Sequence, residues 1–330
     1  MNLPWLTSTW QELAKRRAHS GLPHALMLTG SKGLGKHRLA LELAKWLLCS
    51  NAKTNNLDAP CNNCHSCQLW QAGTHPDFVL SQPEEGSRQI RVDDVRAVNE
   101  FFSKTPQVSH CQVAILRPAE VMNTNAANAL LKTLEEPAGE SYLILEAERI
   151  GSVLPTIRSR CQRVQVNQPE PQQAMNWLQE QGIVAAQAAE ALRLNSGAPL
   201  AALAWIKQDS FSQHQAWFSQ LQSWSQGSAD LQKVAESWNK LEMIDVMHWF
   251  YTVLLDLSKV LLGVPTEQQE LQGQVASLVQ CATLNPTKLI TLQTKVQATL
   301  SQQLAGTGNQ NKVLLYESLL LDWLDLIKNT

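Results

Sequence analysis

The chain has 330 residues, which is enough for two or three domains with ample hydrophobic core. Its apolar content of 44% and its charged content of 17% are those of an ordinary soluble protein. The formal net charge of −2 excludes an overall basic bias toward nucleic acid or membrane surfaces.

No stretch of the sequence predicts a membrane span. The longest apolar stretch, Met247 to Leu262, is interrupted by His248, Asp256 and Lys259, and is too short and too charged to cross a bilayer. The first residues, Met1 to Trp5, lack the basic-then-apolar pattern of a signal peptide. We therefore expect a cytoplasmic protein without a membrane partner. In that compartment, the seven cysteines favour free thiols or a metal site over disulfides.

A glycine-rich loop stands near the start of the chain. A short amphipathic helix is predicted over Pro4 to Arg17, and the apolar run Ala25 to Leu28 predicts a buried strand. The sequence GSKGLGKH follows at residues 30–37, and apolar residues at helical spacing predict a helix over Arg38 to Leu48. Strand, glycine loop and helix in this order are the context of a phosphate-binding P-loop.

The residue types of the loop suit phosphate, with one exception. Gly30, Gly33 and Gly35 would let backbone N–H groups wrap a phosphate, and Lys36 would reach the outer phosphates. The last position should be Ser or Thr, whose hydroxyl holds Mg²⁺, but it is His37. Two readings stay open: weak phosphate binding, or a glycine loop retained for its turn geometry alone.

Strands continue to alternate with helices up to about residue 167. This alternation predicts a parallel sheet covered on both faces. The further strands are expected at residues 77–80, 113–116, 142–145 and 164–166. The helices between them are expected around residues 92–101, and over residues 125–136 before Pro137.

The strand pattern ends after Pro171. Three short helices are predicted at residues 172–181, 184–194 and 199–207, and Asp209 to Gln213 is a candidate linker. Long helices rich in Gln, Leu and Trp follow to the end of the chain. The expected domains are 1–167 with an insertion at 49–67, then 168–208, then 209–330.

Four cysteines are spaced as in a structural metal site. Cys61, Cys64 and Cys67 are each separated by two residues, and Cys49 ends the preceding predicted helix. Four thiolates suit a tetrahedral structural zinc ion with no open position for catalysis. An iron–sulfur cluster and four reduced thiols are the alternatives. The other three cysteines of the chain, Cys111, Cys161 and Cys281, are not needed as ligands. The nearby His65 and His75 are not needed either, because four cysteines already fill a tetrahedron.

Several motifs together resemble one family. The helix NALLKTLEEP at residues 128–137, the triplet Ser159-Arg160-Cys161, the cysteine cluster and the P-loop frame resemble the AAA+ subunits of bacterial sliding-clamp loaders. Further similarity lies at residues 4–5, 23–26 and 72–77, and it is dense up to about Leu203. The resemblance implies an α/β AAA+ (P-loop NTPase-like) domain, a small three-helix lid and an all-α collar that joins subunits into a five-membered ring.

The chain departs from this family where ATP chemistry would occur. Working members end the third strand with an Asp–Glu pair that holds Mg²⁺ and activates water, but here these positions are Arg117 and Pro118. Glu120 lies two residues further on and is expected to point elsewhere. The lid arginine that senses the γ-phosphate matches Leu200. The chain is therefore expected to hydrolyse no ATP.

Arg160 carries the catalytic role that the resemblance implies. In this family the arginine of the Ser-Arg-Cys triplet crosses the subunit interface and contacts the γ-phosphate held by the neighbour, as an arginine finger. An exposed arginine without such a role is the plain alternative, and Arg158 is the rival within the segment.

The resemblance implies a place in the DNA polymerase III holoenzyme, a nucleotidyltransferase. The expected partners are the tau or gamma motor subunits, the delta subunit, the sliding clamp and, through the complex, primer–template DNA. ATP held by the motor subunits would open the clamp, and hydrolysis would release it on DNA. Besides a non-hydrolysing subunit, two functions stay open: an active motor that uses Lys36, and a zinc-dependent DNA-binding module.

Overall fold

The computed structural model describes residues 3–54, 58–84, 87, 89–208, 210–262, 284–304 and 310–327. The chain forms two compact units, Met1–Leu203 and Ala204–Thr330. The division falls inside helix α10 (Pro199–Lys207). Cys281 lies outside the described residues. The division into three domains expected from the sequence stays a prediction.

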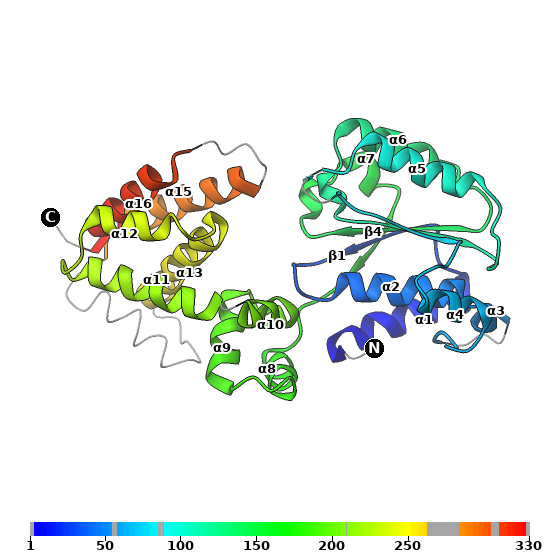
Figure 1. The fold of residues 1–330 in the computed structure, drawn as a ribbon, viewed down its shortest axis with the longest axis horizontal. Coiled ribbons are helices and arrows are strands. Elements are labelled where there is room, and N and C mark those ends of the chain that lie inside the picture. Colours follow the sequence, from blue (N-terminus) through cyan, green and yellow to red (C-terminus); the bar gives the residue numbers. More distant parts are fainter. Residues whose placement is uncertain are drawn as a thin grey trace. The chain divides into compact units, whose positions relative to one another are not determined.

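A five-stranded parallel sheet forms the centre of the first unit (Figure 1). The strands lie in the order β2-β3-β4-β1-β5, and every neighbouring pair is parallel. Their bounds are β1 (Ala25–Thr29), β2 (Phe78–Ser81), β3 (Gln112–Leu116), β4 (Ser141–Ala147) and β5 (Gln162–Gln165). All five agree with the strands expected from the sequence to within two residues at each end. Because the strands are parallel, the segments that follow β1, β3 and β4 meet at one edge of the sheet.

Helices cover both faces of this sheet. In Figure 1, α5, α6 and α7 lie on one face, and α1 and α2 lie on the other. The helices of this part are α1 (Thr7–Ser20), α2 (Lys36–Leu48), α3 (Ser50–Thr54), α4 (His65–Gln71), α5 (Val92–Ser103), α6 (Thr124–Glu135) and α7 (Pro155–Arg158). Three short 3-10 turns are η1 (Pro4–Leu6), η2 (Ala119–Val121) and η3 (Ile150–Ser152). Because both faces are covered, every residue of β1 and β3 is buried.

Local sequence explains where α6 begins and ends. The side chain of Asn123 accepts a hydrogen bond of 2.8 Å from the N–H of Ala126, which satisfies one of the unpaired donors of the first turn. Leu130 and Leu134 face the core of the sheet, and Pro137 follows the last turn. Because α6 runs from the end of β3 back to the start of β4, its last turn, at Glu135, lies near the amino ends of the strands, at the opposite edge of the sheet from the segments that follow β1, β3 and β4.

Three short helices follow the sheet, as the sequence predicts: α8 (Pro171–Glu180), α9 (Ala185–Leu194) and α10. The rings of Trp177 in α8 and Trp5 in η1 meet edge to face at 5.3 Å. The Trp5 indole also donates a 2.8 Å hydrogen bond to the carbonyl of Leu34 in the glycine loop. The start of the chain therefore packs between the glycine loop and the short helices.

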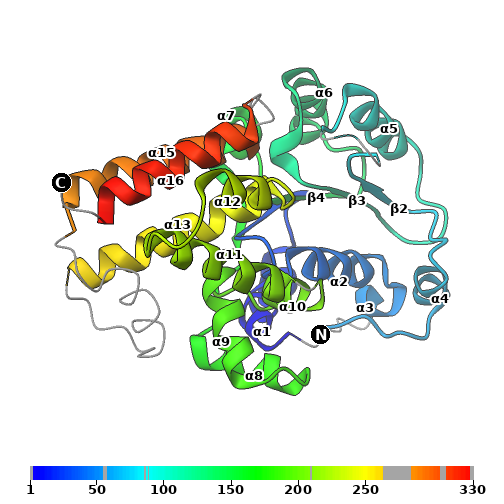
Figure 2. The same ribbon diagram turned by 60° about the vertical axis from the view of Figure 1, so that its left-hand side comes forward.

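The second unit contains only helices in its described residues (Figure 2). They are α11 (Ser210–Ser225), α12 (Leu231–Trp238), α13 (Met243–Leu261), α15 (Pro286–Leu304) and α16 (Lys312–Ile327). Four aromatic side chains, Trp217, Trp238, Phe250 and Trp323, are fully buried in its core. No described helix is long and apolar enough to cross a membrane.

The expected linker at residues 209–213 is wrong for the residues that the structure describes. Residues 210–213 form the first turn of α11, and Asp209 lies outside the described residues. The segment contains neither Gly nor Pro, and the ring of Phe211 packs 5.8 Å from that of Trp205. The segment is polar, yet it forms the start of a packed helix.

Candidate functional site

The glycine loop joins β1 to α2, as the sequence predicts. Gly33 and Gly35 have φ angles of 81° and 90°, a left-handed conformation that side chains disfavour. Gly35 precedes the first residue of α2, Lys36, so the N-terminus of this helix opens onto the loop. The strand, loop and helix of a P-loop are therefore all present.

The loop is covered by other parts of the same unit. A Cβ atom on Gly33 would lie 2.4 Å from the Cβ of Ala201 and 2.5 Å from its nitrogen, and a Cβ on Gly35 would lie 2.7 Å from Leu3. The N–H of Leu200 donates a 3.1 Å hydrogen bond to the carbonyl of Gly33. Leu200, which the sequence predicts to occupy the position of the lid arginine, is an apolar residue at the first turn of α10, packed on the loop.

The ammonium group of Lys36 is bonded to the loop itself. Its Nζ donates to the carbonyls of Gly30 at 2.7 Å and Ser31 at 2.9 Å, and the residue is only 6% exposed. Burial lowers the pKa of Lys36, while the nearby carboxylates of Glu148 and Glu146 act to raise it. The group that would meet the outer phosphates is therefore engaged with backbone carbonyls.

His37 and Arg117 share one buried carboxylate. The Nδ1 atom of His37 lies 2.8 Å from Oε1 of Glu146, at the end of β4, and Nε of Arg117 lies 3.5 Å from Oε2. The Glu146 side chain is 6% exposed, so these nitrogen partners take the place of water as its hydrogen-bonding groups. The two positions at which the sequence predicts that Mg²⁺-binding groups are missing are therefore joined into one polar cluster, which we call the His–Glu–Arg cluster.

Glu120 is engaged with backbone. Its Oε1 accepts hydrogen bonds from the N–H groups of Glu148 at 3.0 Å and Arg149 at 3.3 Å, in the loop after β4. This agrees with the expectation that Glu120 does not replace the missing acidic pair. Its carboxylate instead fixes the loop that leaves the sheet edge.

Arg160 follows α7 and has a partner within the chain. One guanidinium nitrogen, Nη2, lies 2.6 Å from Oε1 of Glu135 at the end of α6, and Nη1 donates to the carbonyl of Thr156 at 3.1 Å. The Arg160 side chain is 36% exposed, and that of Glu135 is 50% exposed. The guanidinium is thus oriented by two contacts yet remains open to solvent.

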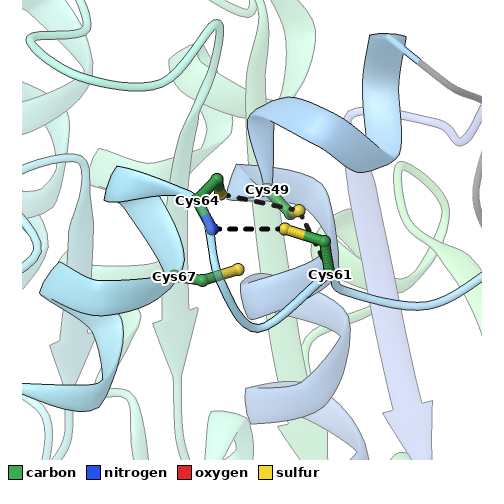
Figure 3. A group of neighbouring side chains, drawn as sticks. All are labelled: Cys49, Cys61, Cys64 and Cys67. Atoms are coloured by element: carbon green, nitrogen blue, oxygen red, sulfur yellow. Dashed lines mark hydrogen bonds between the residues drawn. The ribbon is translucent and has the colours of Figure 1, made fainter.

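The four predicted cysteines converge on one point (Figure 3). Their sulfur atoms all lie within 4.8 Å of one another, and those of Cys49 and Cys64 are 3.9 Å apart. Zinc–sulfur bonds of about 2.3 Å put the sulfurs of a tetrahedron about 3.8 Å apart, which fits this spacing. Backbone N–H groups of Ala52 and Cys61 also donate to the sulfur of Cys49, each at 3.4 Å.

The thiols differ in how readily they ionise. Burial raises the pKa values of Cys49 and Cys67. Although burial acts in the same direction at Cys61, N–H groups of Asn63 and Cys64 donate to its sulfur and lower its pKa to about 6. Four sulfurs this close become thiolates together only when a cation balances them, so the donor set fits a metal ion.

Sequence reasoning missed two acidic side chains of these sites. Glu146 interrupts the otherwise apolar strand SYLILEA, and a charge in a buried strand is itself a signal that a partner is near. Glu135 lies within the family helix at residues 128–137, but no local pattern shows its pairing with Arg160.

Comparison with known proteins identifies relatives along most of the chain. Residues 5–170 match the family model described as DNA polymerase III, delta subunit, and residues 208–325 match the model of the C-terminal part of that subunit. The chain is 34% identical to DNA polymerase III subunit delta' of Pseudomonas aeruginosa, over 98% of this chain and 97% of the relative. It is 31% identical to the Escherichia coli subunit delta', over 96% and 94%.

A solved structure gives a weaker match. A DNA polymerase III gamma subunit-related protein of Thermotoga maritima is 18% identical, with a TM-score of 0.43, over 97% of this chain and all of that one.

Proposed function

Because the chain belongs to the family of DNA polymerase III delta-prime subunits, which are clamp-loader related, we propose that it supports clamp loading without hydrolysing ATP. In this proposal it stands in a five-subunit ring with the motor subunits and delta. ATP bound to the motor subunits opens the sliding clamp, and the loader places it on primer–template DNA.

The His–Glu–Arg cluster supports the absence of hydrolysis most directly. Mg²⁺ takes oxygen ligands in near-octahedral geometry, whereas these positions present an imidazole and a guanidinium. Both are bonded to Glu146, so its carboxylate is committed to them. Phosphoryl transfer depends on a metal ion, on positioning and on charge neutralisation, and neither His37 nor Arg117 offers an oxygen ligand for the metal.

The packing of the glycine loop supports the same conclusion. Ala201 fills the space beside Gly33, and Lys36 bonds to carbonyls of its own loop. We infer that the glycines are retained because α10 and the N-terminal turn approach them closely. In this reading the loop holds parts of the first unit together, and its phosphate-binding role has been lost.

The isolated chain is expected to release no phosphate from ATP above background. The measurement is phosphate release at saturating ATP and Mg²⁺, with Lys36→Ala as the matched control. Activity that persists in Lys36→Ala points to a contaminating enzyme. Activity that this substitution abolishes contradicts the proposal and favours an active motor subunit.

We propose further that Arg160 completes the ATP site of a neighbouring subunit. The guanidinium stays partly exposed, and a planar donor fork suits the oxygens of a phosphate. Its contacts with Glu135 and Thr156 orient it without burying it. A subunit that does not hydrolyse ATP would in this way still accelerate hydrolysis next door.

The four-cysteine cluster is proposed to hold one structural zinc ion. Bound zinc would cross-link the end of α2 to the loop at residues 61–67, and Cys49, Cys61, Cys64 and Cys67 would be its ligands. The cluster leaves no coordination position open, so the ion would stabilise the fold and take no part in ATP chemistry.

Metal analysis of the chain purified without added metal is expected to find one zinc ion per molecule. Cys64→Ser should lose the zinc ion and make the segment around residues 49–67 more sensitive to proteolysis. In such loops the free energy of metal binding contributes directly to the free energy of folding, so loss of the metal destabilises the loop. Cys161→Ser, at a cysteine outside the cluster, should retain the metal. Iron in place of zinc, or full resistance to proteolysis without metal, contradicts the assignment.

A further inference from the structure

A buried polar network lies directly behind the cysteine cluster. The hydroxyl groups of Ser66 and Ser109 lie 2.8 and 2.9 Å from the carbonyl oxygen of Leu48. Both hydroxyls also contact Nε2 of His75, at 2.9 and 3.2 Å. Leu48 is the residue before Cys49, and Ser66 is the residue before Cys67. The network therefore links the two chain segments that supply the cysteine sulfurs.

The hydrogen atoms of this network can be assigned. The N–H of Asp77 donates to Nδ1 of His75 at 3.1 Å, so Nδ1 is the acceptor and the ring proton sits on Nε2. Nε2–H then donates to the serine oxygens, and each serine hydroxyl donates to Leu48. Burial lowers the pKa of His75, partly offset by Asp77, which agrees with a neutral ring.

Asp77 anchors the network to the sheet. Its carboxylate accepts hydrogen bonds from three successive N–H groups, those of Gln107 at 2.6 Å, Val108 at 2.8 Å and Ser109 at 2.7 Å. Asp77 precedes β2, and the segment at 107–109 precedes β3. Asp77 is 1% exposed and His75 is 7% exposed, so water does not replace these contacts. The imidazole is thus held from one side by the sheet and presents its proton to the cysteine loop on the other.

We propose that His75 is a positioning residue for the four-cysteine metal site. Through Ser66 it fixes the first turn of α4, which carries Cys67, and through both serines it fixes the carbonyl of Leu48 beside Cys49. Two of the four sulfurs are thereby held in place before metal arrives, which lowers the entropy lost on binding. This inference rests on the metal site of the proposed function.

The test compares the zinc affinity of four full-length proteins by competition with a chromophoric chelator. They are the wild type, His75→Ala, Ser66→Ala and His24→Ala. Outer contacts of metal sites contribute about 10–100-fold to affinity, so His75→Ala is expected to weaken zinc binding about tenfold. Ser66→Ala should weaken it less. His24 is the matched control, since its Nε2 bonds the carbonyl of Leu134 at 2.9 Å, in α6 on the other face of the sheet, and its loss should leave zinc affinity unchanged.

A second measurement separates positioning from general stability. If His75 acts on the metal site, His75→Ala should destabilise the zinc-loaded protein more than the metal-free protein in urea unfolding. The reason is that a lower zinc affinity also lowers the stability that bound zinc adds to the folded chain. Equal destabilisation in both forms, together with unchanged zinc affinity, overturns the role of His75. If His75→Ala does not fold, Ser66→Ala decides, and wild-type affinity in that variant overturns the inference. A wild-type chain that binds no metal overturns the proposed metal site itself. The wild-type measurement therefore separates failure of the metal site from failure of the role of His75.

Discussion

Replacing Arg160 with alanine is expected to slow ATP hydrolysis about 10³–10⁵-fold at the one interface that this side chain serves. The guanidinium would otherwise stabilise the charge that develops on the transferred phosphoryl group. Reconstituted complexes at saturating ATP are the system to measure. In the proposed ring the other sites keep their own arginines, so total ATPase activity should fall only in part, while clamp loading should fall more.

Folding should be unaffected by this substitution. The ion pair between Arg160 and Glu135 is exposed to solvent, and exposed pairs contribute about 0–1 kcal/mol to stability. Zinc content and ring assembly should therefore stay intact. A lower rate of ATP hydrolysis in Arg160→Ala complexes would then reflect the loss of the guanidinium at the ATP site and not a loss of structure.

Two further variants sharpen the result. Arg160→Lys should restore little activity, since an ammonium group does not reproduce the planar fork that grips phosphate oxygens. Arg158→Ala, in the last turn of α7, is the matched control and should reduce ATP hydrolysis and clamp loading less than Arg160→Ala does. Wild-type activity in Arg160→Ala complexes would leave this chain a purely structural member of the ring.

The second large effect is expected at Gly33, where alanine should destabilise the first unit by about 2–5 kcal/mol. The left-handed conformation costs a side chain about 1–2 kcal/mol, and crowding in a packed site adds about 1–3 kcal/mol. Here the new Cβ would meet the Cβ, nitrogen and Cα of Ala201 at 2.4, 2.5 and 2.9 Å. Denaturant unfolding of the full chain, followed by a probe in the first unit, measures the change.

Gly182→Ala separates the two contributions. Gly182 has a similar φ of 84°, but a Cβ there would meet no atom within 4 Å, so only the conformational cost remains. Adding Ala201→Gly to Gly33→Ala removes the clash with the Cβ of Ala201 and should restore part of the lost stability. The recovery should be incomplete because the clash with the backbone nitrogen of residue 201 persists. Equal destabilisation by Gly33→Ala and Gly182→Ala would show that close packing does not explain this glycine.

The sequence predicted the features that depend on neighbouring residues. Apolar runs and helical spacing located the strands and the helices around them, and the cysteine spacing located a cluster whose sulfurs do converge. The glycine loop was found because its residue types follow a strand and precede a helix. In each case the decisive residues lie close together in the chain.

Contacts between distant residues could not be predicted in this way. His37 meets Glu146 across 109 positions, and the partner of Arg160 lies on another helix. The sequence indicated that His37 and Arg117 could not bind Mg²⁺, but it gave no sign that both bond one carboxylate. His75 likewise read as a spare metal ligand, whereas both its ring nitrogens are engaged by the chain.

The shared carboxylate of Glu146 also makes three positions of the chain depend on one another. A change at one position alone should disturb the others: Arg117→Asp would set a second carboxylate beside Glu146, and Glu146→Ala would remove the carboxylate that both Arg117 and His37 contact. We therefore expect each of the three side chains to contribute to the stability of the first unit through its contact with the shared carboxylate. This one carboxylate thus ties the segment after β3 and the end of β4 to the first turn of α2, three segments that lie far apart in the sequence.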